Sequence, residues 1–139
     1  MTSNRLHATT VAIDGRGVMI TGPSGAGKSD LALRLIDRGA ILVSDDYTEC
    51  TTQNGVVIAS PPATIAGRIE VRGIGIVDMP HLPRADVMLV VTLGETVERM
   101  PEAYPKRVAG IEIPAIALAA FEASAPIKVE IALSRLVEG

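Results

Sequence analysis

The chain has 139 residues, 47% of them hydrophobic and 21% charged, which predicts one globular domain spanning residues 1–139. Its formal net charge is -3 and it has no Lys/Arg-rich run, so neither nucleic acid nor an acidic membrane surface is an expected partner. There is no signal-peptide pattern and no apolar run long enough to cross a bilayer, which predicts a cytoplasmic protein. The single cysteine, Cys50, cannot form an internal disulfide and is expected to behave as a small hydrophobic residue.

The first third of the chain predicts two strands, a loop, a helix and a third strand. Residues 6–14 alternate in polarity, as a strand does, and a Gly-containing turn follows them. An apolar periodicity then indicates a helix that Gly39 ends. The predicted ranges are 6–14 and 17–21 for the first two strands, 30–38 for the helix and 40–44 for the third strand.

The rest of the chain is predicted to consist mainly of strands. The Asn-Gly pair at 54–55 is a strong tight-turn signal and predicts a hairpin. The predicted elements are the hairpin arms 47–50 and 56–59, short apolar strands at 69–71 and 74–77, a strand at 86–92, a short helix at 94–100, a strand at 111–117 and a closing helix at 126–136. Because several strands follow one another with few helices between them, we expect an α/β fold with a mixed central sheet flanked by helices.

The loop between the second strand and the first helix has every fixed position of a phosphate-binding P-loop. It reads Gly22, Pro23, Ser24, Gly25, Ala26, Gly27, Lys28 and Ser29. The glycines allow the backbone to approach a phosphate, Lys28 reaches the β- and γ-phosphates, and the Ser29 hydroxyl can bind Mg²⁺. A helix N-terminus directly after the loop adds a favourable dipole. The pattern predicts binding of a nucleoside triphosphate.

Three acidic residues after the loop are candidates for metal binding or proton transfer. Asp45 and Asp46 follow an apolar strand, where an open sheet delivers side chains to its crevice, and Glu70 comes later. Adjacent carboxylates repel each other unless a bound cation or a proton neutralises part of their negative charge. The other interpretation of the pair is a solvated turn that carries two charges.

The order of these motifs resembles bacterial HPr kinase/phosphorylase. The residues that carry the resemblance are His7, the loop at 22–30, Arg38-Gly39, the segment 42–46 and the block Ile69-Glu70-Val71-Arg72-Gly73-Ile74-Gly75-Ile76-Val77. The resemblance implies a P-loop kinase domain of the HPr kinase/PEP carboxykinase type that uses ATP and Mg²⁺. It also implies that the substrate is a serine of HPr or an HPr-like phosphocarrier of a phosphotransferase system.

The resemblance also implies roles for single residues. Asp46 matches the residue that takes the proton from the acceptor serine, and His7 matches a histidine near the active site. Glu70 matches the second metal ligand beside Ser29, and Asp45 is expected to position Asp46 or to contact the metal. For an active-site arginine we choose Arg99 first and Arg107 second.

The C-terminal part departs from the family pattern. Residues 113–128 lack the family's proline- and arginine-containing segment that serves phosphorolysis, so the kinase direction is predicted and the reverse reaction stays open. The short form resembles truncated alphaproteobacterial homologues. Because relatives assemble as hexamers, a homo-oligomer is a further expectation. Two alternatives also stay open: a nucleotide-sensing regulatory module that transfers nothing, and a small-molecule P-loop kinase.

Overall fold

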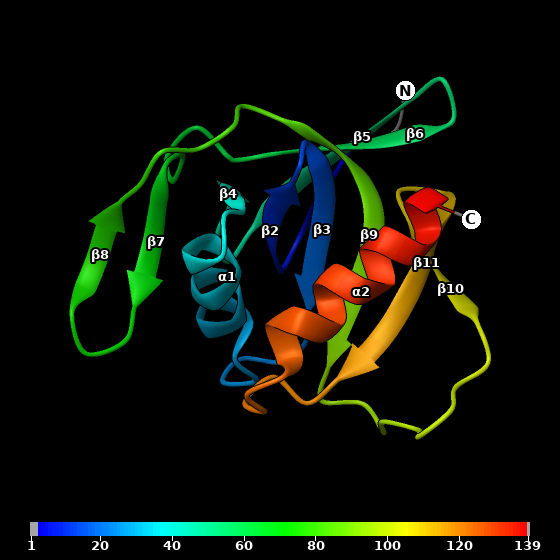
Figure 1. Ribbon diagram of the computed structural model, residues 1–139. Helices are drawn as coiled ribbons and strands as arrows, with labels where there is room; N and C mark the ends of the chain where they lie inside the picture. Colours follow the sequence, from blue (N-terminus) through cyan, green and yellow to red (C-terminus); the bar gives the residue numbers. More distant parts are fainter. Residues whose placement is uncertain (1–2, 139) are drawn as a thin grey trace.

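A mixed, curled sheet with two helices on one of its faces forms most of the computed structural model, which describes residues 3–138 (Figure 1). The elements in chain order are β1 (Ser3–Leu6), β2 (Ala8–Ile13), β3 (Arg16–Thr21), α1 (Lys28–Asp37), β4 (Ile41–Ser44), β5 (Thr48–Gln53), β6 (Val56–Ser60), β7 (Arg68–Val71), β8 (Gly75–Asp78), β9 (Ala85–Leu93), β10 (Tyr104–Val108), β11 (Ile111–Leu118) and α2 (Ala125–Glu138). The predicted class, α/β with a mixed sheet flanked by helices, is confirmed.

The strand order explains why the sheet is mixed. The main path runs β1-β5-β6-β9-β3-β2-β4, and β11 joins the carboxyl half of β9 and carries β10 on its other side. Tight turns at 14–15 and 54–55, whose residues have positive φ angles, make β2–β3 and β5–β6 antiparallel hairpins. β3, β9 and β11 are parallel to one another, so their carboxyl ends meet at one end of the sheet (Figure 1).

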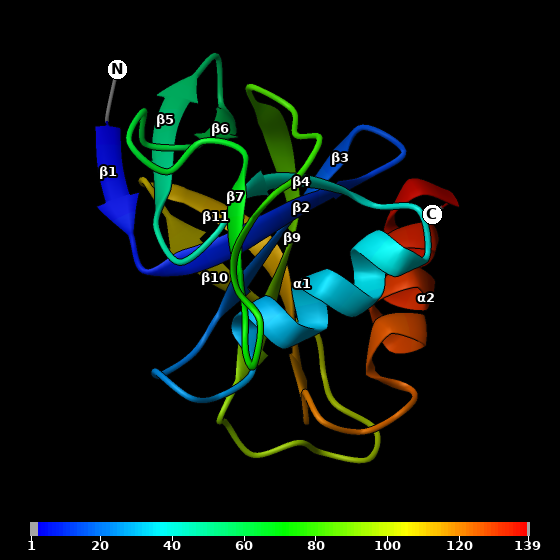
Figure 2. The same cartoon turned by 90° about the vertical axis from the view of Figure 1, so that its left-hand side faces the viewer.

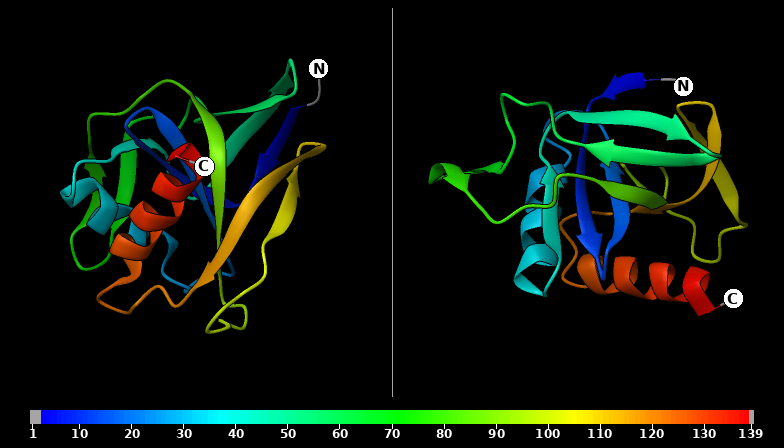
Figure 3. Two further views of the ribbon diagram at one scale, coloured as in Figure 1. Left: turned by 45° about the vertical axis from the view of Figure 1, so that its right-hand side comes forward. Right: turned by 90° about the horizontal axis from the view of Figure 1, so that it is seen from above.

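Both helices cover the same face of the sheet, and the strands alternate between two cores. On the helix side, Val18 and Ile20 of β3 pack in one cluster with Leu31 of α1 and Val129 of α2. Met19, between them in β3, belongs to a second cluster built almost only from strand residues. The second cluster is enclosed because the outer strands curve over the face that the helices leave uncovered (Figure 3).

The hairpin β7–β8 is a separate two-stranded sheet (Figure 1), and its strand β7 lies beside α1 (Figure 2). Ile69 of β7 is buried in the helix-side cluster, which attaches the hairpin to the body. Its far end is exposed, since Ile74 and Ile76 keep 78% and 64% of their surface accessible. The predicted strands at 69–71 and 74–77 therefore exist, but they lie outside the main sheet.

Three predictions of local structure were wrong or incomplete. The predicted helix at 94–100 is an exposed loop, because Gly94 adopts a positive φ of 85° and no residue of the segment is buried. A helix this short is not stable without tertiary packing. The edge strand β10 was missed because Pro105 and two basic residues interrupt its pattern, although an edge strand tolerates proline. The first strand is split, with His7 in a bend between β1 and β2.

None of the helices within residues 3–138 is both long and apolar enough to span a bilayer.

Candidate nucleotide and phosphoryl-transfer site

The P-loop lies where β3 ends and α1 begins, at the carboxyl end of the parallel strands. Gly27 caps α1 in a left-handed conformation, with φ 99°, and a Cβ there would lie 2.9 Å from Cζ of Phe121. A Cβ on Gly22 would lie 2.9 Å from the carbonyl oxygen of Leu93. Both glycines are thus required by backbone conformation and by close packing, and the loop leads directly into the N-terminus of α1, whose first amides are available to an anion.

Lys28 holds its ammonium group over the loop. Its Nζ donates hydrogen bonds to the carbonyl oxygens of Gly22 (2.8 Å) and Pro23 (3.1 Å), and the residue is buried. The Lys28 ammonium group is therefore held beside the loop amides. A phosphate group bound there would contact both the positive charge and the backbone N–H donors.

Asp45 connects three segments of the chain around this loop. Its Oδ1 accepts hydrogen bonds from the hydroxyls of Ser29 (2.5 Å) and Thr9 (3.1 Å). Its Oδ2 accepts one from the backbone N–H of Glu70 (2.9 Å). Asp45 is only 6% exposed, so the P-loop, β2 and β7 meet at one buried carboxylate. The sequence prediction was that Asp45 positions Asp46 or contacts the metal, and the structure places it against the predicted metal ligand Ser29.

The residues around Ser29 fit a magnesium ion that also binds phosphate. Because Ser29 donates its proton to Asp45, its oxygen lone pairs stay free for a cation. The oxygen donors offered here are the kind that Mg²⁺ prefers. Within residues 3–138 no cluster of three His, Cys, Asp or Glu side chains could hold a metal by itself.

His7 and Asp46 form a pair beside the loop. Nε2 of His7 lies 2.8 Å from Oδ1 of Asp46, although the residues are 39 positions apart. Asp46 has a positive φ of 69°, and its N–H donates to Oγ1 of Thr9 (3.1 Å). The Tyr47 ring lies 5.2 Å from the His7 ring, centroid to centroid. Side-chain exposure of 39% for His7 and 56% for Asp46 leaves this pair open to a large substrate.

Thr9 is a site residue that the sequence prediction did not name. Its hydroxyl contacts both acidic residues, because it donates to Asp45 and accepts from the Asp46 amide. The only hint in the sequence is that Thr9 follows His7 by two positions, so that both fall on the same face of the strand predicted at 6–14. Nothing in the local pattern identifies its partners 36 and 37 positions away.

The other predicted site residues, Glu70, Arg99 and Arg107, make fewer side-chain contacts with the P-loop and the two aspartates. Glu70 is tied to the site through its backbone, and its side chain is exposed. Arg99 lies in the exposed loop after β9, at the same end of the sheet as the P-loop. Arg107 pairs with Glu112 (3.7 Å) at the amino end of β11, which is the opposite end. Arg99 as an active-site arginine stays a prediction.

Comparison with known proteins agrees with these observations. Residues 1–118 match the profile of the family described as the HPr Serine kinase C-terminal domain. The chain is similar to the HPr kinase/phosphorylases of Clostridium tetani (45% identity over 91 residues, 65% of this chain and 30% of the relative) and Clostridium botulinum (47% over 78 residues, 56% and 26%). It thus matches less than a third of the length of these relatives. It also resembles the solved Hpr(Ser) kinase/phosphatase of Coxiella burnetii, with a TM-score of 0.82, 33% identity and coverage of 98% of this chain and 99% of that one.

Proposed function

We propose, from the premise that this chain belongs to the HPr Serine kinase C-terminal domain family, that it transfers the γ-phosphoryl group of ATP to a serine hydroxyl. The proposed acceptor is an HPr-like phosphocarrier protein. The observation that supports the proposal best is the adjacency of two carboxylates with different surroundings. Asp45 is buried against Ser29 of the P-loop, and Asp46 is exposed beside His7.

The P-loop would bind and orient the triphosphate. The loop amides and Lys28 would contact phosphate oxygens, while Ser29, oriented by Asp45, would hold Mg²⁺. The carboxylate of Glu70, whose backbone N–H bonds to Asp45, would be the second ligand of that ion. A bound Mg²⁺ would neutralise charge on the phosphates, as it does in other kinases. Because phosphoryl transfer depends mainly on positioning and charge stabilisation, a fixed loop and a fixed cation account for most of the chemistry required.

Asp46 would act as the general base. A serine hydroxyl is a weak nucleophile near pH 7, so a carboxylate within hydrogen-bond reach assists its attack. The serine oxygen forms a bond to the γ-phosphorus, its proton passes to Asp46, and the bond from the γ-phosphorus to the bridging oxygen breaks to release ADP. His7, at 2.8 Å from Asp46, would hold that carboxylate in one orientation. The proposal places the reaction in the cytoplasm, and assembly into a homo-oligomer remains part of it.

The proposal is tested by phosphate transfer to a purified HPr-like protein with labelled ATP and Mg²⁺. The variant is Asp46→Asn and its matched control is Asp14→Asn, because both aspartates are exposed and have positive φ angles (69° and 51°) that asparagine tolerates. We expect acid-stable label on serine, a loss of about 10²–10⁴-fold in rate for Asp46→Asn and none for Asp14→Asn.

Other outcomes would identify the alternatives. Tight nucleotide binding without label on any acceptor would favour a nucleotide-sensing module. ATP consumption with label on a metabolite would favour a small-molecule kinase. Incubation of phosphorylated acceptor with inorganic phosphate, with release of pyrophosphate as the readout, tests the reverse reaction separately.

A further inference from the structure

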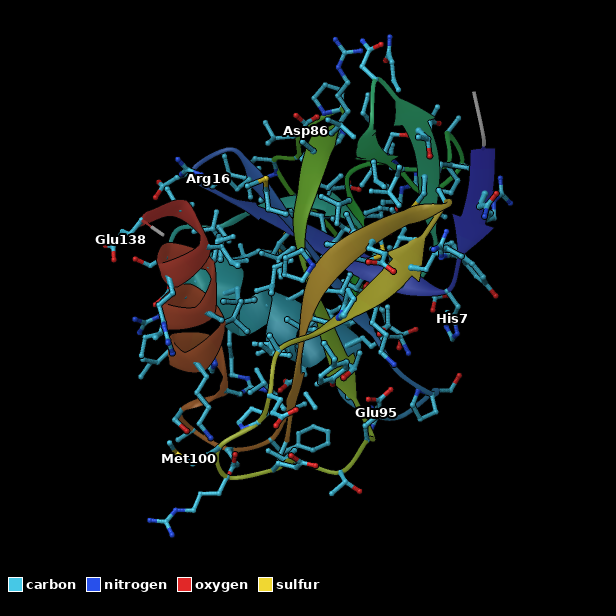
Figure 4. All side chains as sticks on the ribbon, turned by 90° about the vertical axis from the view of Figure 1, so that its right-hand side faces the viewer. His7, Arg16, Asp86, Glu95, Met100 and Glu138 are labelled. Atoms are coloured by element: carbon cyan, nitrogen blue, oxygen red, sulfur yellow. The ribbon has the colours of Figure 1, made fainter. Side chains whose placement is uncertain are left out.

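A cavity adjoins the P-loop at Ala26. It has a volume of about 600 Å³ and is lined mostly by apolar groups from three segments. These segments are the P-loop at Ala26, the loop after β9 at Gly94 to Val97, and the loop after β11 at Leu118 to Glu122. All three follow the carboxyl ends of parallel strands, where ligands of open α/β sheets bind. Figure 4 shows Glu95 and Met100 at this end of the molecule, with Asp86, near the start of β9, at the other.

Phe121 is the most unusual residue of this cavity. It is the chain's only phenylalanine, yet 69% of its surface is exposed. Its ring lies against the loop, since a Cβ on Gly27 would come within 2.9 Å of Cζ. Val97, which lines the cavity from the facing loop, is also exposed, at 45%. Large apolar side chains thus gather at the rim of a cavity that shares a wall with the phosphate site.

The loop that carries Phe121 is held in place without burying the ring. Arg34 of α1 donates hydrogen bonds to the backbone carbonyls of Ala120 and Glu122, and it pairs with Asp30 at 3.0 Å. On the facing side, a Cβ on Gly94 would lie 3.1 Å from Cδ of Pro23, which shows how closely that loop approaches the P-loop. The cavity is therefore preformed, which reduces the entropic cost of binding.

We infer that this cavity receives the base of the bound nucleotide and that Phe121 stacks on it. The inference rests on the proposed function, because it assumes that the triphosphate occupies the P-loop. A base attached to that triphosphate must leave the loop on one side, and this cavity is apolar and continuous with Ala26. An exposed aromatic ring gains the most from stacking on a planar base, which every nucleobase offers. Ala119 is exposed and also lines the cavity, so the size of its side chain limits the space available to that base.

The test compares two probes by calorimetry in the presence of Mg²⁺: a non-hydrolysable ATP analogue and inorganic tripolyphosphate, which has no base. Phe121→Ala should weaken the analogue about tenfold, equivalent to about 1.4 kcal/mol, and leave tripolyphosphate binding unchanged. Phe121→Trp should restore the analogue's affinity. Ala119→Leu, which fills the cavity, should also act on the analogue alone. Ile127→Ala, an exposed apolar residue on α2, is the matched control and should change neither.

The two probes separate the inference from the proposed function. Equal weakening of both probes by Phe121→Ala would mean that the ring only supports the P-loop, and unchanged affinity for both would mean that the base lies elsewhere. Either result overturns the inference, while serine phosphorylation by the unaltered chain would still stand. If the unaltered chain binds neither probe, the inference and the proposed nucleotide site fail together.

Discussion

The buried carboxylate of Asp45 should support the fold as well as the site, and Asp45→Asn tests this directly. The substitution keeps the size of the side chain but removes its charge and replaces one acceptor oxygen by an NH₂ group. Three donors then lose a charged partner: the Ser29 and Thr9 hydroxyls at 2.5 and 3.1 Å, and the Glu70 amide at 2.9 Å. The hydroxyls can rotate to other partners, whereas the amide cannot.

The magnitude follows from the difference between charged and neutral hydrogen bonds. A hydrogen bond to a charged group contributes about 1 kcal/mol more than a neutral one, so three such bonds would lose about 3 kcal/mol. The neutral asparagine also avoids part of the desolvation penalty that the buried charge of Asp45 imposes on the folded state, which offsets some of this loss. We therefore expect Asp45→Asn to lower the free energy of unfolding by about 2 kcal/mol.

Urea unfolding measures this change, with Asp86→Asn as the control. Asp86 is exposed on β9, so its substitution removes the same charge without a buried partner and should leave stability within about 0.5 kcal/mol. Hydrogen exchange adds a local readout, because the Glu70 amide should exchange faster in Asp45→Asn. An unfolding free energy equal to that of Asp86→Asn, together with unchanged exchange at Glu70, would refute the role assigned to Asp45.

Four further predictions concern three sites: Glu70, Cys50 and the pair Lys106–Glu95. Glu70→Gln should lower the rate of phosphate transfer more than it weakens nucleotide binding, because a metal ion held by Glu70 neutralises charge that develops on the phosphates during transfer. An equal loss in the rate and in the binding affinity would contradict a role of Glu70 in metal binding. Burial raises the pKa of the Cys50 thiol to about 11. A thiol reagent at pH 8 should therefore label the chain only when it unfolds. Rapid labelling of the native protein would contradict the burial of Cys50. Because an unfolded thiol ionises at a lower pH, with a pKa of about 8.5, stability should also fall as the pH rises from there toward the folded value. Lys106 donates a hydrogen bond to Glu95 and lowers its pKa, so Lys106→Ala should raise the pKa of Glu95 in an NMR titration; an unmoved titration would show that the pair is not formed.

Much of the site could be predicted because its parts are local in the sequence. The P-loop is one contiguous run from Gly22 to Ser29, and its function depends on backbone turns and on a following helix, which neighbouring residues determine. The hairpin turn at 54–55 and the alternation of apolar residues in the strands are local signals of the same kind. Asp45 and Asp46 were recognised because they directly follow an apolar strand. The same local reasoning failed at 94–100, where a short apolar pattern finds no surface to pack against.

What only the tertiary structure decided is which distant side chains meet. Thr9, Ser29 and Glu70 lie 36, 16 and 25 positions from Asp45, and His7 lies 39 positions from Asp46. They come together because β2 is inserted between β3 and β4 and because β7 packs on α1 outside the sheet. The contact of Phe121 with Gly27 likewise depends on β11 joining β9 in parallel. Strand order and register arise from the packing of the whole chain, so no short stretch of residues contains them.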